Sequence, residues 1–99
     1  DPRMRVHKAT NLAWTETAHH GFAVALVPDG PMWVLEGSSA VIWDYIAGEP
    51  DGFTAAEFAK SLAAKMSDDD SICERIESET VTFLSELVSR GLLVRDQGE

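Results

Sequence analysis

The sequence predicts an α+β fold in which a three-stranded antiparallel β-meander is followed by three helices, in the order β-β-β-α-α-α. Two observations lead to this prediction. Between residues 12 and 35, short apolar runs alternate with turn signals, which is typical of consecutive strands. From Ser38 onward, apolar residues recur at helical spacing and are interrupted at glycine and at polar runs. A chain of 99 residues suits one domain.

The predicted strands cover residues 12–17, 22–27 and 32–35, and His19-His20-Gly21 and Pro28-Asp29-Gly30-Pro31 form the turns between them. The third strand of a meander lies at an edge of the sheet. The run 32–35 holds none of the lysines, prolines or charges with which natural edges are usually blocked. Such an edge is either covered by the rest of the fold or left open for a guest strand, and we expect the second.

Three helices are expected after the strands. The first is expected to start with Ser38 or Ser39 as its N-cap and to end at Gly48. Its apolar stripe is predicted to be Val41, Ile42, Tyr45 and Ile46. The second is predicted to start at a capping box formed by Thr54 and Glu57 and to run to about Met66.

The third helix is predicted from Ser71, in a capping box with Glu74, to Arg90, and Gly91 then stops it. Its apolar residues follow two lines about a quarter turn apart. The first line comprises Ile76, Thr80, Phe83 and Leu87, and the second comprises Val81, Leu84 and Val88. Either both lines are core, or the second forms a groove with strand 32–35 that takes an extended peptide.

Charge and composition exclude several classes of function. The net charge is −9 and the eight Lys and Arg residues are scattered, which disfavours nucleic acid and anionic membrane as partners. No apolar run reaches the length of about 18 residues that a membrane span requires. The single cysteine, Cys73, cannot form a disulfide within the chain, and it suits a reducing, cytoplasmic location.

No catalytic residues, metal ligands or cofactors are predicted. The pair His19-His20 lacks a third metal ligand at useful spacing, and the run Asp68-Asp69-Asp70 lacks the alternating ligands of a calcium loop. The sequence contains neither a nucleophile elbow nor a glycine-rich phosphate loop. We therefore expect that this chain is not an enzyme.

Several local patterns resemble the PqqD-like family, also called RiPP recognition elements. They are residues 21–27 followed by Pro28-Asp29-Gly30, then Val34-Leu35, then residues 40–43 leading to Gly48. The longest pattern is residues 83–93, which follow the family's FL-x-x-L-x-x-x-G-L-L ending. The resemblance covers about residues 5 to 95. The chain has Leu35-Glu36 where many members carry Leu-Asn, and Glu79-Thr80 where many carry Asp-Val.

The resemblance implies a winged-helix-like domain that binds the leader segment of a ribosomally synthesised precursor peptide. The leader would add a strand to strand 32–35 and be clamped against the third helix. The domain would then present the peptide to a modifying enzyme, such as a radical SAM enzyme, a leader peptidase or a cyclase. Carried over by position, the peptide-binding residues are Met32, Trp33, Val34, Leu35, Val81, Leu84, Ser85 and Val88.

Residues 1–11 are mixed polar and basic with no clear period, and we expect them to form an extended lead-in, with 12–95 as the recognition domain and 96–99 as a tail. Two alternatives stay open. One is a winged-helix DNA-binding regulator, although the third helix carries more acidic than basic residues. The other is a homodimerising adaptor in which strand 32–35 pairs with its own copy.

Overall fold

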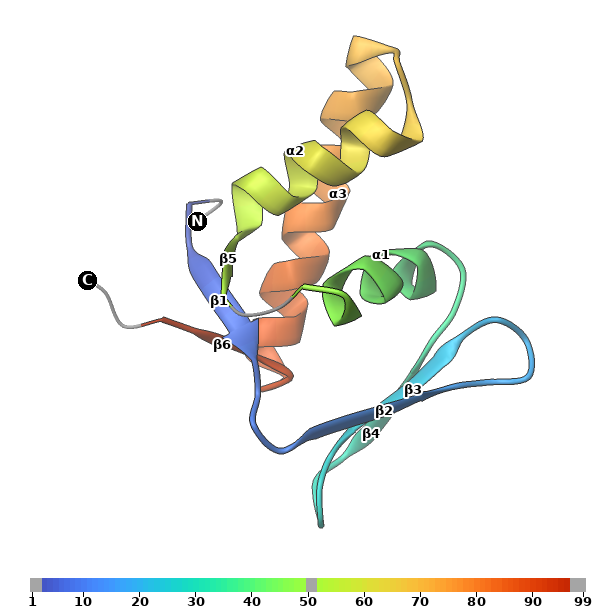
Figure 1. The fold of residues 1–99 in the computed structure, drawn as a ribbon, viewed down its shortest axis with the longest axis vertical. Helices are drawn as coiled ribbons and strands as arrows, with labels where there is room; N and C mark the ends of the chain where they lie inside the picture. The colour runs from blue at the N-terminus through green and yellow to red at the C-terminus, as the bar shows by residue number, and fades with distance from the viewer. Residues whose placement is uncertain (1–2, 50–51, 97–99) are drawn as a thin grey trace.

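The computed structural model describes residues 3–49 and 52–96, and its elements confirm an α+β fold with strands followed by three helices (Figure 1). The described elements are β1 (Arg5–Lys8), β2 (Leu12–Glu16), β3 (Phe22–Leu26), β4 (Met32–Leu35), α1 (Ser38–Ala47), β5 (Phe53–Thr54), α2 (Ala55–Met66), α3 (Asp70–Ser89) and β6 (Leu93–Arg95).

The predicted meander is present as an antiparallel sheet in the order β2-β3-β4. Leu12 lies opposite Leu26, and Phe22 lies opposite Leu35. At Gly21, which joins β2 to β3, an added Cβ would lie 2.5 Å from the Leu35 carbonyl oxygen. This position therefore requires glycine, because any side chain would push β3 away from the end of β4.

A second sheet, in the order β5-β1-β6, was not predicted. Its central strand falls in the expected lead-in 1–11 and pairs with both β5 and β6. Val6, on β1, is fully buried. The single-sheet prediction is corrected to two sheets. Strands this short, with partners far away in sequence, show little periodicity of their own. The likeness to a winged helix stays a prediction.

The core lies where the three helices meet the two sheets, and α2 and α3 pack extensively against each other (Figure 1). Its largest fully buried side chains include Trp43, Ile46, Leu84, Leu87 and Leu92. The predicted stripe of α1 is partly wrong, because Val41 and Tyr45 are 43% and 38% exposed. The helix instead turns Trp43 inward, where its ring meets the Trp14 ring edge-on at 5.7 Å.

Two of the three predicted caps fall on other residues. Gly37, with φ of +64°, precedes α1 in place of a capping serine. Asp69 caps α3, and its carboxylate accepts hydrogen bonds from the N–H groups of Ser71 and Ile72 at 2.9 and 3.1 Å. Thr54 does occupy the N-cap position of α2, but its side chain makes no capping hydrogen bond.

Candidate functional site

The outer edge of β4 is open. In residues 3–49 and 52–96, β4 pairs with β3 alone. The Leu26 N–H donates to the Pro31 carbonyl at 3.3 Å, and hydrogen-bonded pairs recur at every second residue of an antiparallel ladder. The backbone groups of Trp33 and Leu35 therefore point towards β3, and those of Met32 and Val34 point towards the open edge.

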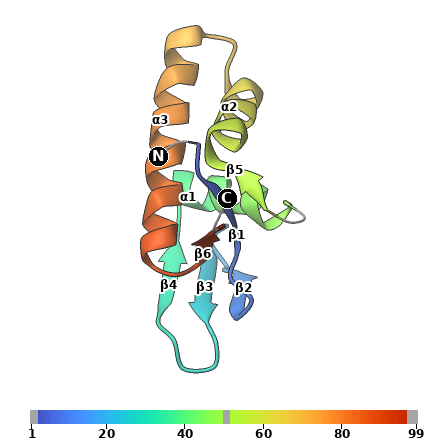
Figure 2. The same ribbon diagram turned by 90° about the vertical axis from the view of Figure 1, so that its left-hand side faces the viewer.

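The side chains of β4 alternate between two environments. Leu35 is buried and Trp33 is half-buried against the core, whereas Met32 and Val34 are 65% and 56% exposed. The Arg90 guanidinium lies 5.7 Å from the centre of the Trp33 ring. This cation–π contact joins β4 to the C-terminal end of α3, and Figure 2 shows β4 on the same side of the meander as α3.

A cavity of about 400 Å³ lies between the start of α1 and α3, and no residue of β4 lines it. Only Glu36 and Gly37 separate β4 from its first lining residue. The lining residues, which we call the groove, are Ser38, Ser39, Ile42, Ser78, Glu79, Thr82, Phe83 and Glu86. The groove therefore combines a small apolar floor with hydroxyl groups and two carboxylates.

The four predicted residues of the third helix are not in the lining of the groove. Leu84 is fully buried in the core, and Ser85 and Val88 are half-buried. Val81 lines a separate cavity between α2 and α3, together with Ala56 and Ala59. The groove instead lies on the helix face that carries Thr82 and Glu86, about 100–140° around the helix from Val81.

Little in the sequence marks this face of α3 as a binding surface. From residue type alone, Glu79 and Glu86 are expected to face solvent, and Phe83 is expected to lie in the core. Spacing alone shows that residues 79, 82, 83 and 86 share one side of a helix, but not which neighbour that side meets.

Another cavity, of about 200 Å³, adjoins the groove and shares Ser38, Ile42 and Glu79 with it. We call it the Thr80 pocket. Its remaining lining residues are Val41, Leu62, Met66, Ile76 and Thr80. Most of its wall is therefore apolar.

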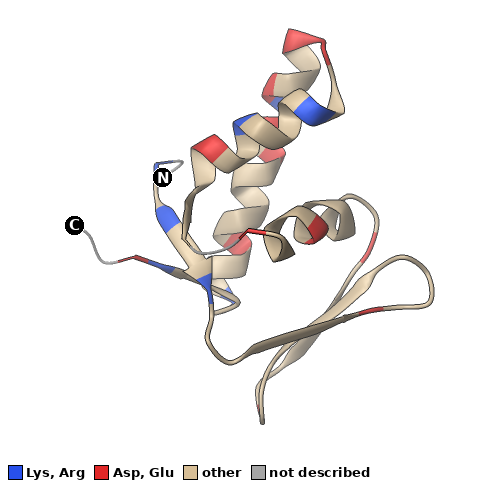
Figure 3. Ribbon diagram, viewed as in Figure 1, with Lys and Arg blue, Asp and Glu red and all other residues tan. Residues whose placement is uncertain are grey.

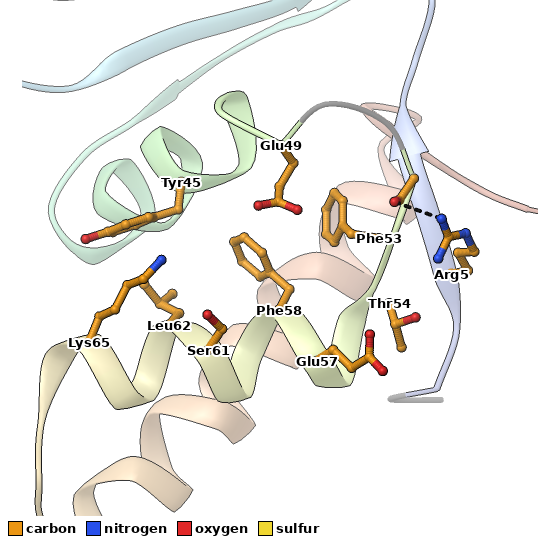
Figure 4. A pocket seen from close by; sticks show the side chains of 11 residues that line it. Arg5, Tyr45, Glu49, Phe53, Thr54, Glu57, Phe58, Ser61, Leu62 and Lys65 are labelled. Carbon is orange, nitrogen blue, oxygen red and sulfur yellow. Dashed lines mark hydrogen bonds between the residues drawn. The ribbon is translucent and has the colours of Figure 1, made fainter.

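A fourth cavity, of about 320 Å³, lies between the end of α1, β5 and α2 (Figure 4). The Phe53 and Phe58 rings pack 5.0 Å apart between centres, tilted by 41°, and the Lys65 ammonium lies 5.0 Å from the Tyr45 ring centre. Arg5 closes one side by donating to the Gly52 carbonyl at 3.0 Å. Its lining contains both basic and acidic side chains and no residue of β4.

The described residues hold no group of three or more His, Cys, Asp and Glu side chains placed to bind a metal ion. Burial raises the pKa of the Cys73 thiol, and nearby Asp70 adds to the effect. The thiol lies 3.2 Å from the Ser67 carbonyl oxygen. None of the helices in the described ranges is long and apolar enough to cross a membrane.

Basic residues are dispersed over β1, α2, α3 and β6, as Figure 3 shows, and α3 carries only Arg75 and, at its C-cap, Arg90. The recognition helix of a DNA-binding domain normally carries such a stripe. The charge distribution therefore does not favour the DNA-binding alternative.

Comparison with curated proteins and with solved structures finds no match. Comparison with protein families does find one. The sequence model described as Coenzyme PQQ synthesis protein D (PqqD) matches residues 23–93 of the 99-residue chain. The match runs from β3 to the start of β6 and includes the open edge, all three helices and the groove. The chain belongs to the PqqD family.

Proposed function

We propose that this protein binds the leader segment of a ribosomally synthesised precursor peptide and presents it to a modifying enzyme. Membership of the PqqD family supports a role in the biosynthesis of coenzyme PQQ or of a similar peptide-derived product. The leader would pair with β4 as a further strand of the meander. The partner would be a radical SAM enzyme, a leader peptidase or a cyclase, and this chain would supply no catalytic group.

The observation that carries the proposal is the open edge of β4. Met32 and Val34 each offer an unpaired N–H and C=O to a guest backbone. Strand addition uses such groups, and the guest's alternate side chains provide specificity. This edge has no proline or charged residue to block a guest.

Backbone pairing alone would bind weakly. Each hydrogen bond contributes about 0.5–1.5 kcal/mol net, and association costs at least about 4 kcal/mol in lost freedom. Burial of two or three guest side chains, at about 1.5–3 kcal/mol each, would make up the difference. The groove beside β4 offers this burial through Ile42 and Phe83, so we assign the helix side of the site to Thr82, Phe83 and Glu86.

The test uses the short open reading frames beside the gene as sources of candidate leaders. Peptides covering their N-terminal halves are titrated against the protein, with tryptophan fluorescence and calorimetry as readouts. We expect one of them to bind with micromolar affinity or better. We expect Val34→Pro to weaken that binding at least about tenfold, because proline cannot donate the outward hydrogen bond.

Glu16→Pro is the matched control. The Val27 N–H donates to the Asn11 carbonyl at 2.9 Å, so by the same alternation the N–H of Glu16 points outward from the opposite edge of the meander. This variant should bind the leader normally. Equal losses in both variants, with both folded by circular dichroism, would refute strand addition on β4.

The same edge could instead pair with a second copy of this chain. Light scattering over a range of concentrations separates the two cases. A dimer that Val34→Pro converts to monomer, with no leader bound by either form, would favour the adaptor function over peptide recognition.

A further inference from the structure

The Thr80 pocket contains a buried polar group without a partner. Thr80 is fully buried, and its hydroxyl oxygen has no hydrogen-bond partner among the described residues. A buried hydroxyl left unpaired costs free energy, so native proteins usually pair it. Thr80 lines the pocket, so a ligand whose donor displaced the atoms that cover this oxygen would supply the missing partner.

The pocket also borders the Glu79 carboxylate, which has no basic partner among the described residues. Glu79 is exposed and lines both the pocket and the groove. Within the described ranges no basic side chain forms an ion pair with Glu79 or Glu86. Arg90 lies one turn beyond Glu86, yet its guanidinium sits over Trp33.

The pocket has the features that fit a long basic side chain. It has apolar walls, a carboxylate at its border and an unpaired hydroxyl group. A long methylene stem fits against Val41, Ile42 and Ile76, as lysine and arginine stems commonly do on apolar surfaces. The cationic end can donate to the Glu79 carboxylate and the Thr80 hydroxyl oxygen. A purely aliphatic side chain would leave Thr80 unpaired, and an acidic one would be repelled by Glu79.

We propose that the Thr80 pocket receives a lysine or arginine side chain of the peptide bound at β4. The inference rests on the proposed function and deepens it, because it states which leaders the protein selects. A segment that pairs with β4 and continues past Leu35 would enter the groove, which adjoins the pocket through Ser38 and Ile42. The net charge of −9 also favours a basic ligand.

The test is a selection from a displayed library of random linear peptides against the full chain. The same selection is made with Glu79→Gln, Thr80→Val and Val34→Pro. Glu74→Gln is the matched control, because it removes an exposed α3 carboxylate that lines the cavity against α2 instead.

We expect peptides whose binding depends on Val34 to share a lysine or arginine at one fixed position. Replacing that residue by norleucine, or Glu79 by Gln, should each weaken binding about tenfold. Together they should weaken it little further, because both remove the same contact. Thr80→Val should weaken binding of the basic peptide several-fold without weakening the norleucine peptide, and Glu74→Gln should change neither.

The outcomes separate the two proposals. Peptides that depend on Val34 but show no basic preference, or that bind Glu79→Gln normally, would overturn the inference and leave the proposed function standing. If no selected peptide depends on Val34, strand addition fails, and the inference fails with it.

Discussion

Thr80 is the residue at which stability and the proposed binding oppose each other. Its unpaired hydroxyl is buried in a mostly apolar wall, so Thr80→Val should raise the free energy of unfolding by about 1 kcal/mol. Urea denaturation measures the change. Thr82→Val, at an exposed position two residues further along the same helix, should have little effect. A clear loss of stability in Thr80→Val would show that the hydroxyl has a partner in the folded protein.

Asp69 predicts a pH dependence of stability at the start of α3. Hydrogen bonds from the Ser71 side chain and then from the Ile72 and Ser71 N–H groups hold its pKa below the ordinary value of 3.8. A carboxyl with a lowered pKa stabilises the folded state above that ordinary value, and this contribution disappears as the pH falls through the lowered pKa.

Comparison of Asp69→Ala with the parent protein tests this effect. The parent should be more stable at neutral pH, and the difference should shrink as the pH falls below about 3.8. Asp69→Asn retains a capping acceptor without the charge, and its deficit should be smaller. A difference in unfolding free energy that stays constant over this pH range would contradict the assignment.

At the scale of the element, β1 makes residues 5–8 part of the folded domain. Val6 is fully buried, and β1 is the central strand of the second sheet. Val6→Asp should therefore destabilise the protein by about 3 kcal/mol or more, because it buries an unpaired charge. Thr10→Asp, exposed just beyond the strand, is the control and should unfold at the same denaturant concentration as the parent. Native stability in Val6→Asp would show that β1 is dispensable.

The helices and strands differ in how well their sequences predicted their existence and bounds. The helix predicted from Ser71 to Arg90 is observed as Asp70–Ser89, because apolar periodicity and the terminal glycine both mark it. The two residues of β5 and the three of β6 contain no such period, and their common partner β1 is remote in sequence. Pairing of this kind depends on the folded chain.

For the molecule as a whole, the candidate site depends on what each end of α3 contacts. Its N-terminal half packs with α2, and its C-terminal end reaches the meander at Trp33 (Figures 1 and 2). The groove forms where α1 leaves β4 and crosses this helix. The groove and the Thr80 pocket share Ser38, Ile42 and Glu79, and Ser38 follows the end of β4 by three residues in the chain.

The sequence by itself determined the meander, the three helices, the unblocked strand 32–35 and the acidic character that disfavours nucleic acid. These features follow from local periodicity, turn residues and charge, which need no knowledge of neighbours. Only the tertiary structure decided that α3 turns Thr82 and Glu86 towards the groove while Leu84 enters the core. The physical reason is that a helix with a broad apolar face can pack in more than one rotation, and contacts with α1, α2 and both sheets select one of them.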